Sequence, residues 1–205
     1  MENGQRINEI TLHGRVEEDA RLSHTNHGRD FWCFPISVLR LSGAQDRLNV
    51  LVTRQAAGGV LPVRGEEVTV QGEVRSFNNR SGQGSRLVIT VYARTLLREA
   101  GEDDNRLFLS GTLCKPPVFR RTPLGREICD MILAVSRRYG WADYLPCIAW
   151  GTLARRCGAL TVGDRVCLRG RLQSRTYVKR TDAGQEERTA FEVSVMDMDG
   201  ANASS

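Results

Sequence analysis

The sequence is poor in several residue types, and each shortage excludes a class of protein. Of its 205 residues, 13 are aromatic and three are histidine, and the six cysteines form no C-x-x-C pair. No zinc-ligand spacing can be assembled from these residues, so we predict no metal and no cofactor. No run of 18 apolar residues occurs, and the first residues lack a charged-then-apolar secretory pattern. We therefore predict a cytoplasmic protein without membrane contact.

Sequence patterns typical of catalysis are missing as well. No G-x-x-x-x-G-K-[ST] loop is present for nucleotide hydrolysis. The acidic residues are scattered over turn-like segments, as Asp143, Asp164 and Asp182 are, whereas nuclease chemistry needs carboxylates clustered around a metal. No serine or cysteine is spaced from a histidine as in a catalytic triad. We therefore predict a protein that is not an enzyme and has no catalytic residues.

Lysine is almost absent, because only Lys115 and Lys179 interrupt a set of 29 basic residues that are otherwise arginine. The charge is uneven: residues 1–105 hold 13 arginines and 14 acidic residues, whereas residues 106–205 hold 16 basic and 10 acidic residues. Arginine pairs with phosphate and also stacks on bases, so the second half predicts an anionic partner. A coding sequence rich in G and C would also favour arginine, and this explanation stays open.

The chain contains an internal repeat. A shift of 97 residues places Gly14 on Gly111, and a shift of 98 places Gly72 on Gly170. Towards the end of each copy a shift of 104 fits best, which predicts a longer loop between the last two strands of the second copy. The acidic segment 98–105 reads as a linker. We predict domains at residues 1–97 and 106–199, with the linker between them and a short tail at 200–205.

Each copy has the same order of elements. Five segments alternate apolar and polar residues, as strands do, and a short helix-like segment lies between the third and fourth (54–61 and 151–160). This order is that of the OB-fold, and glycines inside the strands suit the bends of a small barrel. We predict an all-β chain of two tandem OB-fold (five-stranded Greek-key) barrels, each with a short helix between strands 3 and 4. A generic β-sandwich is the alternative.

The second copy resembles the bacterial single-stranded DNA-binding protein (SSB) family. Residues 106–198 contain, in the order of that family, R-x-T-P-x-G, L-A-V-x-R, W-G-x-L-A, L-x-x-G-D-x-V and G-R-L-Q-S-R-x-Y. The first copy resembles the family only through the repeat and lacks W-G-x-L-A. Family members commonly end in an acidic, phenylalanine-containing tip that recruits repair and replication enzymes. This chain ends in MDMDGANASS, so the resemblance implies a tandem form without that tip.

The resemblance implies that four aromatic residues stack on DNA bases: Tyr139, Tyr144, Trp150 and Tyr177. The nearby basic residues predicted to contact phosphate are Arg121, Arg137, Arg138, Arg175, Lys179 and Arg180. Weaker candidates are Trp141, Phe77 and Arg80. The residues support this independently, because aromatic rings interleaved with arginines match both the face of a base and its phosphate. The alternatives are core packing for Trp150, a cross-strand pair for Tyr144 and an exposed turn for Trp141.

The first copy lacks these rings. At the positions of Tyr139, Tyr144, Trp150 and Tyr177 it has, by the shifts above, Ser42, Arg47, Thr53 and Asn79. Its Trp32 and Phe34 share one face of a strand, a pattern more typical of a core than of a binding surface. We predict a degenerate first barrel that binds DNA weakly or serves in assembly.

The sequence thus predicts sequence-independent binding of single-stranded DNA in replication, repair or recombination, by a nucleoid-associated protein. Replication and repair proteins stay open as partners. Related proteins build assemblies of four OB folds, so we expect a homodimer. The alternative is a primosome- or conjugation-type accessory module whose main partner is another protein, which the loss of rings in the first copy suits. Binding to RNA stays open, because stacking tolerates both sugars.

Overall fold

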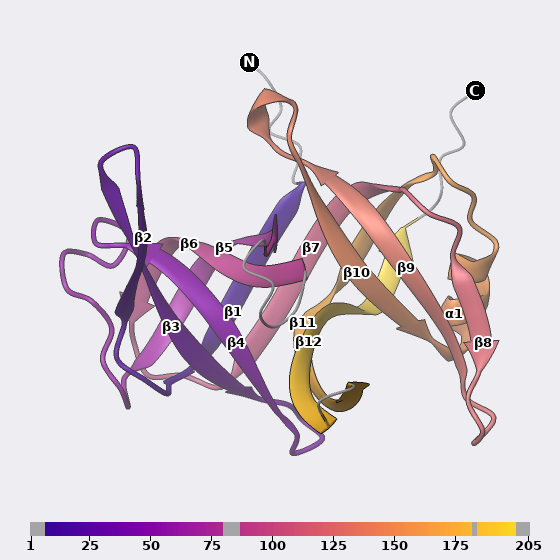
Figure 1. The fold of residues 1–205 in the computed structure, drawn as a ribbon, viewed down its shortest axis with the longest axis horizontal. Coiled ribbons are helices and arrows are strands. Elements are labelled where there is room, and N and C mark those ends of the chain that lie inside the picture. The colour runs from indigo at the N-terminus through magenta and orange to yellow at the C-terminus, as the bar shows by residue number, and fades with distance from the viewer. Residues whose placement is uncertain (1–6, 80–86, 182–183, 200–205) are drawn as a thin grey trace. The chain divides into compact units, whose positions relative to one another are not determined.

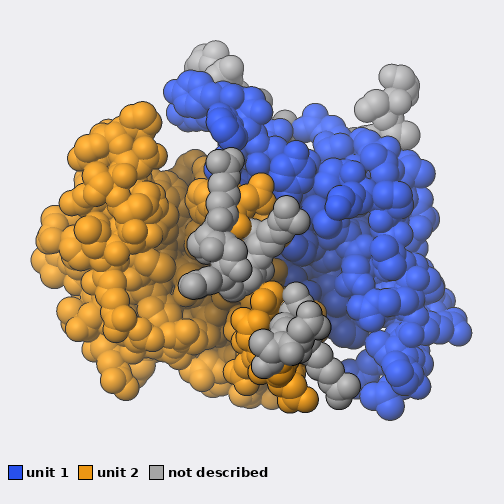
Figure 2. Space-filling view, viewed as in Figure 1, with its two compact units in different colours: residues 1–9, 106–172, 192–205 blue, residues 10–105, 173–191 orange. Residues whose placement is uncertain are grey.

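The structure is a computed structural model that describes residues 7–79, 87–181 and 184–199, apart from the side chains of residues 179–181. Two compact units are present, and Figure 2 colours them separately. One unit is built chiefly from residues 106–172, and the other from residues 10–105 together with residues 173–191. The predicted division of the chain at residues 98–105 stays a prediction.

Strands dominate both copies of the repeat (Figure 1). The first copy contains β1 (Asn8–Val16), β2 (Arg21–Asn26), β3 (Arg29–Leu39), β4 (Gln45–Thr53), β5 (Glu67–Asn78) and β6 (Leu87–Arg98). The second contains β7 (Asp104–Leu113), β8 (Val118–Arg121), β9 (Glu127–Ser136), the 3-10 turn η1 (Arg138–Gly140), β10 (Ala142–Trp150), α1 (Gly151–Gly158), β11 (Arg165–Thr181) and β12 (Gly184–Asp199).

The two copies close into barrels by the same pairings. In the first barrel, β1 pairs antiparallel with β3 and β5, β3 with β4, and β5 with β6, while β4 and β6 run parallel. In the second barrel, β7, β9, β10, β11 and β12 take the places of β1, β3, β4, β5 and β6. β2 and β8 add a hairpin strand to β3 and β9. This arrangement confirms the predicted tandem OB fold.

Alternation along the strands fills each barrel with apolar side chains. In the first barrel Leu12, Phe34, Ile36 and Leu48 are fully buried. In the second barrel the fully buried side chains include Leu109, Leu113, Leu133, Leu145 and Leu168. The opposite side of each strand is left for polar or functional residues, because successive side chains point to opposite faces.

The glycines inside the strands lie where two strand backbones approach closely. A Cβ on Gly72 would lie 2.0 Å from the carbonyl oxygen of Tyr92, and one on Gly170 would lie 2.1 Å from that of Ser194. These two glycines are equivalent in the repeat, so Tyr92 and Ser194 are equivalent too, which corresponds to a shift of 102. The parallel pairs Val50–Val91 and Cys147–Val193 give the same shift. The predicted shift of 104 for the last strand is therefore wrong by two residues.

One part of the fold prediction is wrong in the first barrel. The second barrel has the helix α1 after its third strand, but residues 54–59 form successive turns. Gly58 and Gly59 have positive φ values of 69° and 90°, a left-handed conformation that ends any right-handed helix. The backbone N–H of Gly59 donates to the carbonyl of Arg54 over 2.8 Å and closes this turn.

Residues 173–191, the outer part of the β11–β12 hairpin, belong to the compact unit that contains the first barrel. Within that unit, the backbone N–H of Ser174 donates to Asp46 over 2.8 Å. The backbone N–H of Arg47 donates in turn to the Ser174 hydroxyl over 3.0 Å. These two hydrogen bonds hold the base of this segment at the start of β4.

Candidate nucleic-acid interface

The exposed face of β9 and β10 carries two of the predicted stacking residues. Leu145, Cys147 and Ala149 point into the barrel, so Tyr144 and Trp150 point to the opposite face. Tyr144 lies opposite Ala134 and Trp150 lies opposite Ile128 in the antiparallel register. The two positions are six residues apart, which is about 20 Å along a strand. Both rings are accessible, so neither is a core residue.

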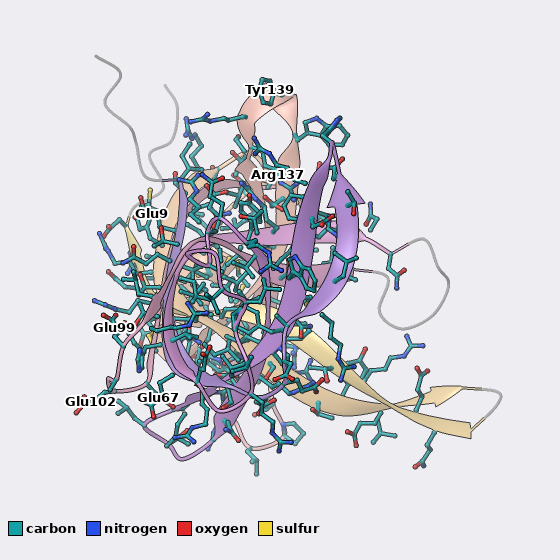
Figure 3. All side chains as sticks on the ribbon, turned by 90° about the vertical axis from the view of Figure 1, so that its left-hand side faces the viewer. Glu9, Glu67, Glu99, Glu102, Arg137 and Tyr139 are labelled. Atoms are coloured by element: carbon teal, nitrogen blue, oxygen red, sulfur yellow. The ribbon has the colours of Figure 1, made fainter. Side chains whose placement is uncertain are left out.

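The hairpin between β9 and β10 presents two more rings. Tyr139 lies in η1 with a φ of 63°, a left-handed conformation that non-glycine residues rarely adopt. Figure 3 shows its side chain at the outer end of this hairpin. The exposed fractions of the five aromatic candidates are 93% for Tyr139, 72% for Trp141, 51% for Tyr144, 42% for Trp150 and 36% for Tyr177.

Arg137, one of the predicted phosphate contacts, makes a buried ion pair. Its Nε donates to Asp143 Oδ2 over 2.6 Å, and its Nη2 donates to the other carboxylate oxygen. The Asp143 side chain is fully buried, so the pair joins the end of β9 to the start of β10. Arg40 and Asp46 make the equivalent pair in the first barrel, with 2.7 Å between Nε and Oδ2. Arg137 is therefore committed to Asp143, and we leave it out of the proposed phosphate contacts.

An arginine-rich groove of about 710 Å³ lies beside Trp150. It is lined by Arg121, Gly125, Arg126, Glu127, Trp150, Gly151 and Arg155. Glu127 accepts hydrogen bonds from Arg155 Nε over 2.5 Å and from Arg121 Nη2 over 2.9 Å. The hydrogen bond from Arg155, together with that from Arg121, lowers the pKa of Glu127, so this carboxylate is ionised at neutral pH. Three arginines face one carboxylate, which leaves the groove positive.

Two of these arginines were not among the predicted contacts. Arg126 follows the R-x-T-P-x-G motif and Arg155 follows W-G-x-L-A, so both lie next to segments that had been singled out. Sequence spacing alone does not predict that these segments meet, because β9 and α1 contact one another only in the folded barrel. Arg121 and Arg155 each donate a hydrogen bond to Glu127, and this shared carboxylate joins the two segments.

The remaining candidates lie on hairpins. The guanidinium carbon of Arg175 lies 5.7 Å from the centre of the Tyr177 ring, a cation–π distance. Arg138 is exposed next to Tyr139, and Phe77 is exposed near the end of β5. The backbones of Lys179 and Arg180 belong to β11, but their side chains lie outside the description, as does the whole of Arg80.

Other kinds of site find no counterpart in the described part of the chain. No three or more histidine, cysteine or acidic side chains gather there in a way that could hold a metal ion. None of the described helices is long and apolar enough to cross a membrane.

Two closed barrels with this strand order, one of them with exposed rings and arginines, define a tandem OB-fold protein. The crystal structure of the wild-type single-stranded DNA-binding protein from Thermus aquaticus has the same fold over 97% of this chain and 95% of that one. Its TM-score is 0.77 and its sequence is 21% identical.

Residues 104–200 match the model of the single-strand binding protein family. The single-stranded DNA-binding protein A of Bacillus subtilis (strain 168) is 35% identical over 80 residues, which cover 36% of this chain and 46% of that protein. The single-stranded DNA-binding protein 1 of Staphylococcus aureus (strain COL) is 33% identical over 99 residues, covering 45% and 56%. This chain thus spans about half the length of the curated relatives it matches. The second barrel is thus similar to proteins of the single-strand binding protein family.

Proposed function

We propose that the chain binds single-stranded DNA without sequence preference and without catalysis. The observation that carries this proposal is the set of accessible rings on the second barrel, where Tyr144 and Trp150 share one face of a strand. The names of the bacterial relatives, which are single-stranded DNA-binding proteins, support the choice of ligand. Replication, repair and recombination are the processes in which such binding is needed.

Stacking explains why the binding would not depend on sequence. Every base has a π-face, so a ring on the barrel surface accepts any of them, and each stacked base contributes about 1–3 kcal/mol. The rings of Tyr139, Tyr144 and Trp150 are accessible in the second barrel, and Tyr177 lies on its long hairpin. Base-pairing edges take no part in these contacts, and a paired base in a duplex exposes no face to a ring.

The backbone of the strand would be held by arginine. Arg121, Arg126 and Arg155 line the groove beside Trp150, so a base stacked on this ring leaves its phosphate near three guanidinium groups. Arg138 and Arg175 lie beside Tyr139 and Tyr177 in the same way. If about six phosphates are neutralised in all, the slope of log K against log salt is about −4.

We also propose a homodimer, in which two chains supply four OB barrels. A light-scattering mass of twice 22.9 kDa is the expected result, and the mass of a single chain would contradict it.

The test is a fluorescence titration with oligo-dT. Trp150→Ala and Tyr144→Ala each lower the affinity by about 5- to 150-fold, which corresponds to about 1–3 kcal/mol. The matched control is Phe119→Ala on β8, because its ring is 43% exposed against 42% for Trp150 but lies over Gly158 of α1, away from the groove. Equal affinities of all three variants for oligo-dT would exclude base stacking on the face that carries Tyr144 and Trp150.

Duplex DNA and oligo-rU complete the experiment. We expect duplex DNA to compete poorly, because its bases are already stacked on one another. Comparison of dT with rU at the same length measures the preference between the two sugars. A chain that binds duplex as tightly as single strands uses arginine alone, and this result would contradict the proposed mechanism.

A further inference from the structure

The first barrel has its own group of rings outside the core. The ring of His24 on β2 stacks on that of Phe31 on β3, with 4.9 Å between their centres and 9° between their planes. The Phe31 ring also contacts Tyr92 of β6, with 6.2 Å between the centres. None of the three is buried, unlike Phe34 in the core. The barrel predicted to be degenerate therefore presents an aromatic surface.

The strand register shows how this surface relates to that of the second barrel. Phe31 lies directly opposite Thr53, just as Ile128 lies opposite Trp150. Thr53 and Trp150 are equivalent in the repeat, so the large ring has changed strand: it is on β10 in the second barrel and on β3 in the first. Directly opposite residues share a face of the sheet. Each barrel thus has one aromatic residue at this cross-strand position.

A groove of about 810 Å³ has one of these three rings, Tyr92, in its wall. It is lined by Arg29, Asp30, Trp32, Thr53, Arg54, Gln55, Ala56, Tyr92, Ala93, Arg94 and Thr95. It combines two aromatic residues with three arginines and one acidic residue. The groove beside Trp150 in the second barrel likewise has three arginines and one acidic residue, but a single aromatic residue.

Two of the three arginines of the groove, Arg54 and Arg94, are held in place by neighbouring residues. The guanidinium carbon of Arg54 lies 5.7 Å from the centre of the Trp32 ring, and its Nη1 donates to the carbonyl of Gly59 over 3.2 Å. Arg94 pairs with Glu73, whereas the exposed side chain of Arg29 lies at the start of β3. Trp32 is partly buried and lines the groove, whereas Phe34 on the same face of β3 is fully buried.

We propose that the first barrel contains a second binding site for single-stranded nucleic acid, in this groove. Bases stack on Tyr92 and Trp32, and the phosphates lie against Arg29 and Arg54. The proposal rests on the proposed function for its class of ligand, but it uses a different barrel and different strand positions. With both barrels occupied, one chain covers roughly 8–32 nucleotides rather than the 4–16 of one OB fold.

The distribution of tryptophan allows each barrel to be observed separately. Trp32 is the only tryptophan of the first copy, and Trp141 and Trp150 belong to the second. The double variant Trp141→Phe/Trp150→Phe therefore reports on the first barrel alone, and the variant Trp32→Phe reports on the second. Both are prepared as the full chain and titrated with dT oligomers of increasing length and with rU as the sugar control.

We expect oligo-dT to quench the Trp32 reporter. Adding Tyr92→Ala lowers the affinity of that reporter by at least about fivefold, as loss of one stacked base does. Leu97→Ala on the same strand is the control, because this exposed side chain lies outside the groove. Arg29→Gln, which replaces an exposed side chain, reduces the salt slope of the Trp32 reporter by about 0.7.

The outcomes separate the two proposals. Quenching in the Trp32→Phe variant without quenching of the Trp32 reporter overturns the second site and leaves the proposed function intact. A Trp32 response that Tyr92→Ala and Arg29→Gln both leave unchanged also overturns it, because the quenching then arises outside the groove. Absence of any response in both reporters overturns the proposed function, and the second site with it. Quenching by rU but not dT in both reporters retains the sites and makes RNA the ligand.

Discussion

Removal of the buried carboxylate at the base of the β9–β10 hairpin tests how the second barrel holds its binding face. Asp143 has a fully buried side chain, and its partner Arg137 is 22% exposed. The substitution Asp143→Ala removes both hydrogen bonds and leaves a guanidinium with little access to water. An exposed pair on the same sheet offers the comparison, since Arg120 and Asp130 are 52% and 41% exposed and lie 2.8 Å apart.

The expected magnitudes differ clearly. Breaking a buried pair by removing one partner costs about 3–5 kcal/mol, because the remaining charge is left without compensation. Arg137 keeps some contact with solvent, so we expect a value near the lower limit, about 3 kcal/mol. Asp130→Ala should cost at most about 1 kcal/mol, because water screens the exposed pair.

Urea denaturation measures both values. In a Trp32→Phe background the remaining tryptophans, Trp141 and Trp150, report on unfolding of the second barrel alone. For an m value of about 2 kcal/mol/M, Asp143→Ala lowers the midpoint by about 1.5 M and Asp130→Ala by less than about 0.5 M. Equal midpoints for the two variants would refute the assignment of Arg137 to the structure, and Arg137 would return to the list of phosphate contacts.

Three further predictions concern stability and reactivity. Gly72→Ala places a Cβ 2.0 Å from a carbonyl oxygen, so the free energy of unfolding, measured with heat or urea, should fall by at least about 2 kcal/mol. The control is Gln71→Ala, which changes an exposed neighbouring residue and should have little effect. The lowered pKa of Glu127 contributes stability at neutral pH that is lost as the pH falls below about 4.5, and Glu127→Gln should flatten this part of a pH–stability curve. Burial raises the pKa of Cys157 to about 12, so at pH 8 thiol reagents should label it only after unfolding.

The sequence predicted the barrels well because strand alternation is a local signal. The prediction failed for the helix of the first barrel and for the alignment of the last strand, because features other than alternation determine them. The helix expected over residues 54–61 is absent because Gly58 and Gly59 take left-handed conformations. The shift of the last strand was wrong by two residues because alternation has a period of two, so shifts of 102 and 104 place the same side chains inward. The parallel pairing of β4 with β6 and the close approach of Gly72 to Tyr92 distinguish them.

The site was predicted less completely. Exposure of Tyr139, Tyr144 and Trp150 agrees with the pattern of their strands and turns. The groove of the first barrel could not be found in the same way, because its rings come from Trp32 and Tyr92, which are distant in sequence. Their meeting depends on the parallel pairing of two strands, for which the sequence has no local signal.

The repeat offers an internal comparison that separates structural from binding residues. Residues identical in both copies serve the barrel: Gly72 and Gly170 allow close backbone approach, and Arg40 and Arg137 neutralise a buried carboxylate. The large rings, in contrast, differ in position between the copies. A barrel that had lost its function would be expected to lose its exposed rings without replacement, because exposed rings add little to stability. The first barrel instead has rings and arginines around a groove, and this favours a retained binding role over one in assembly alone.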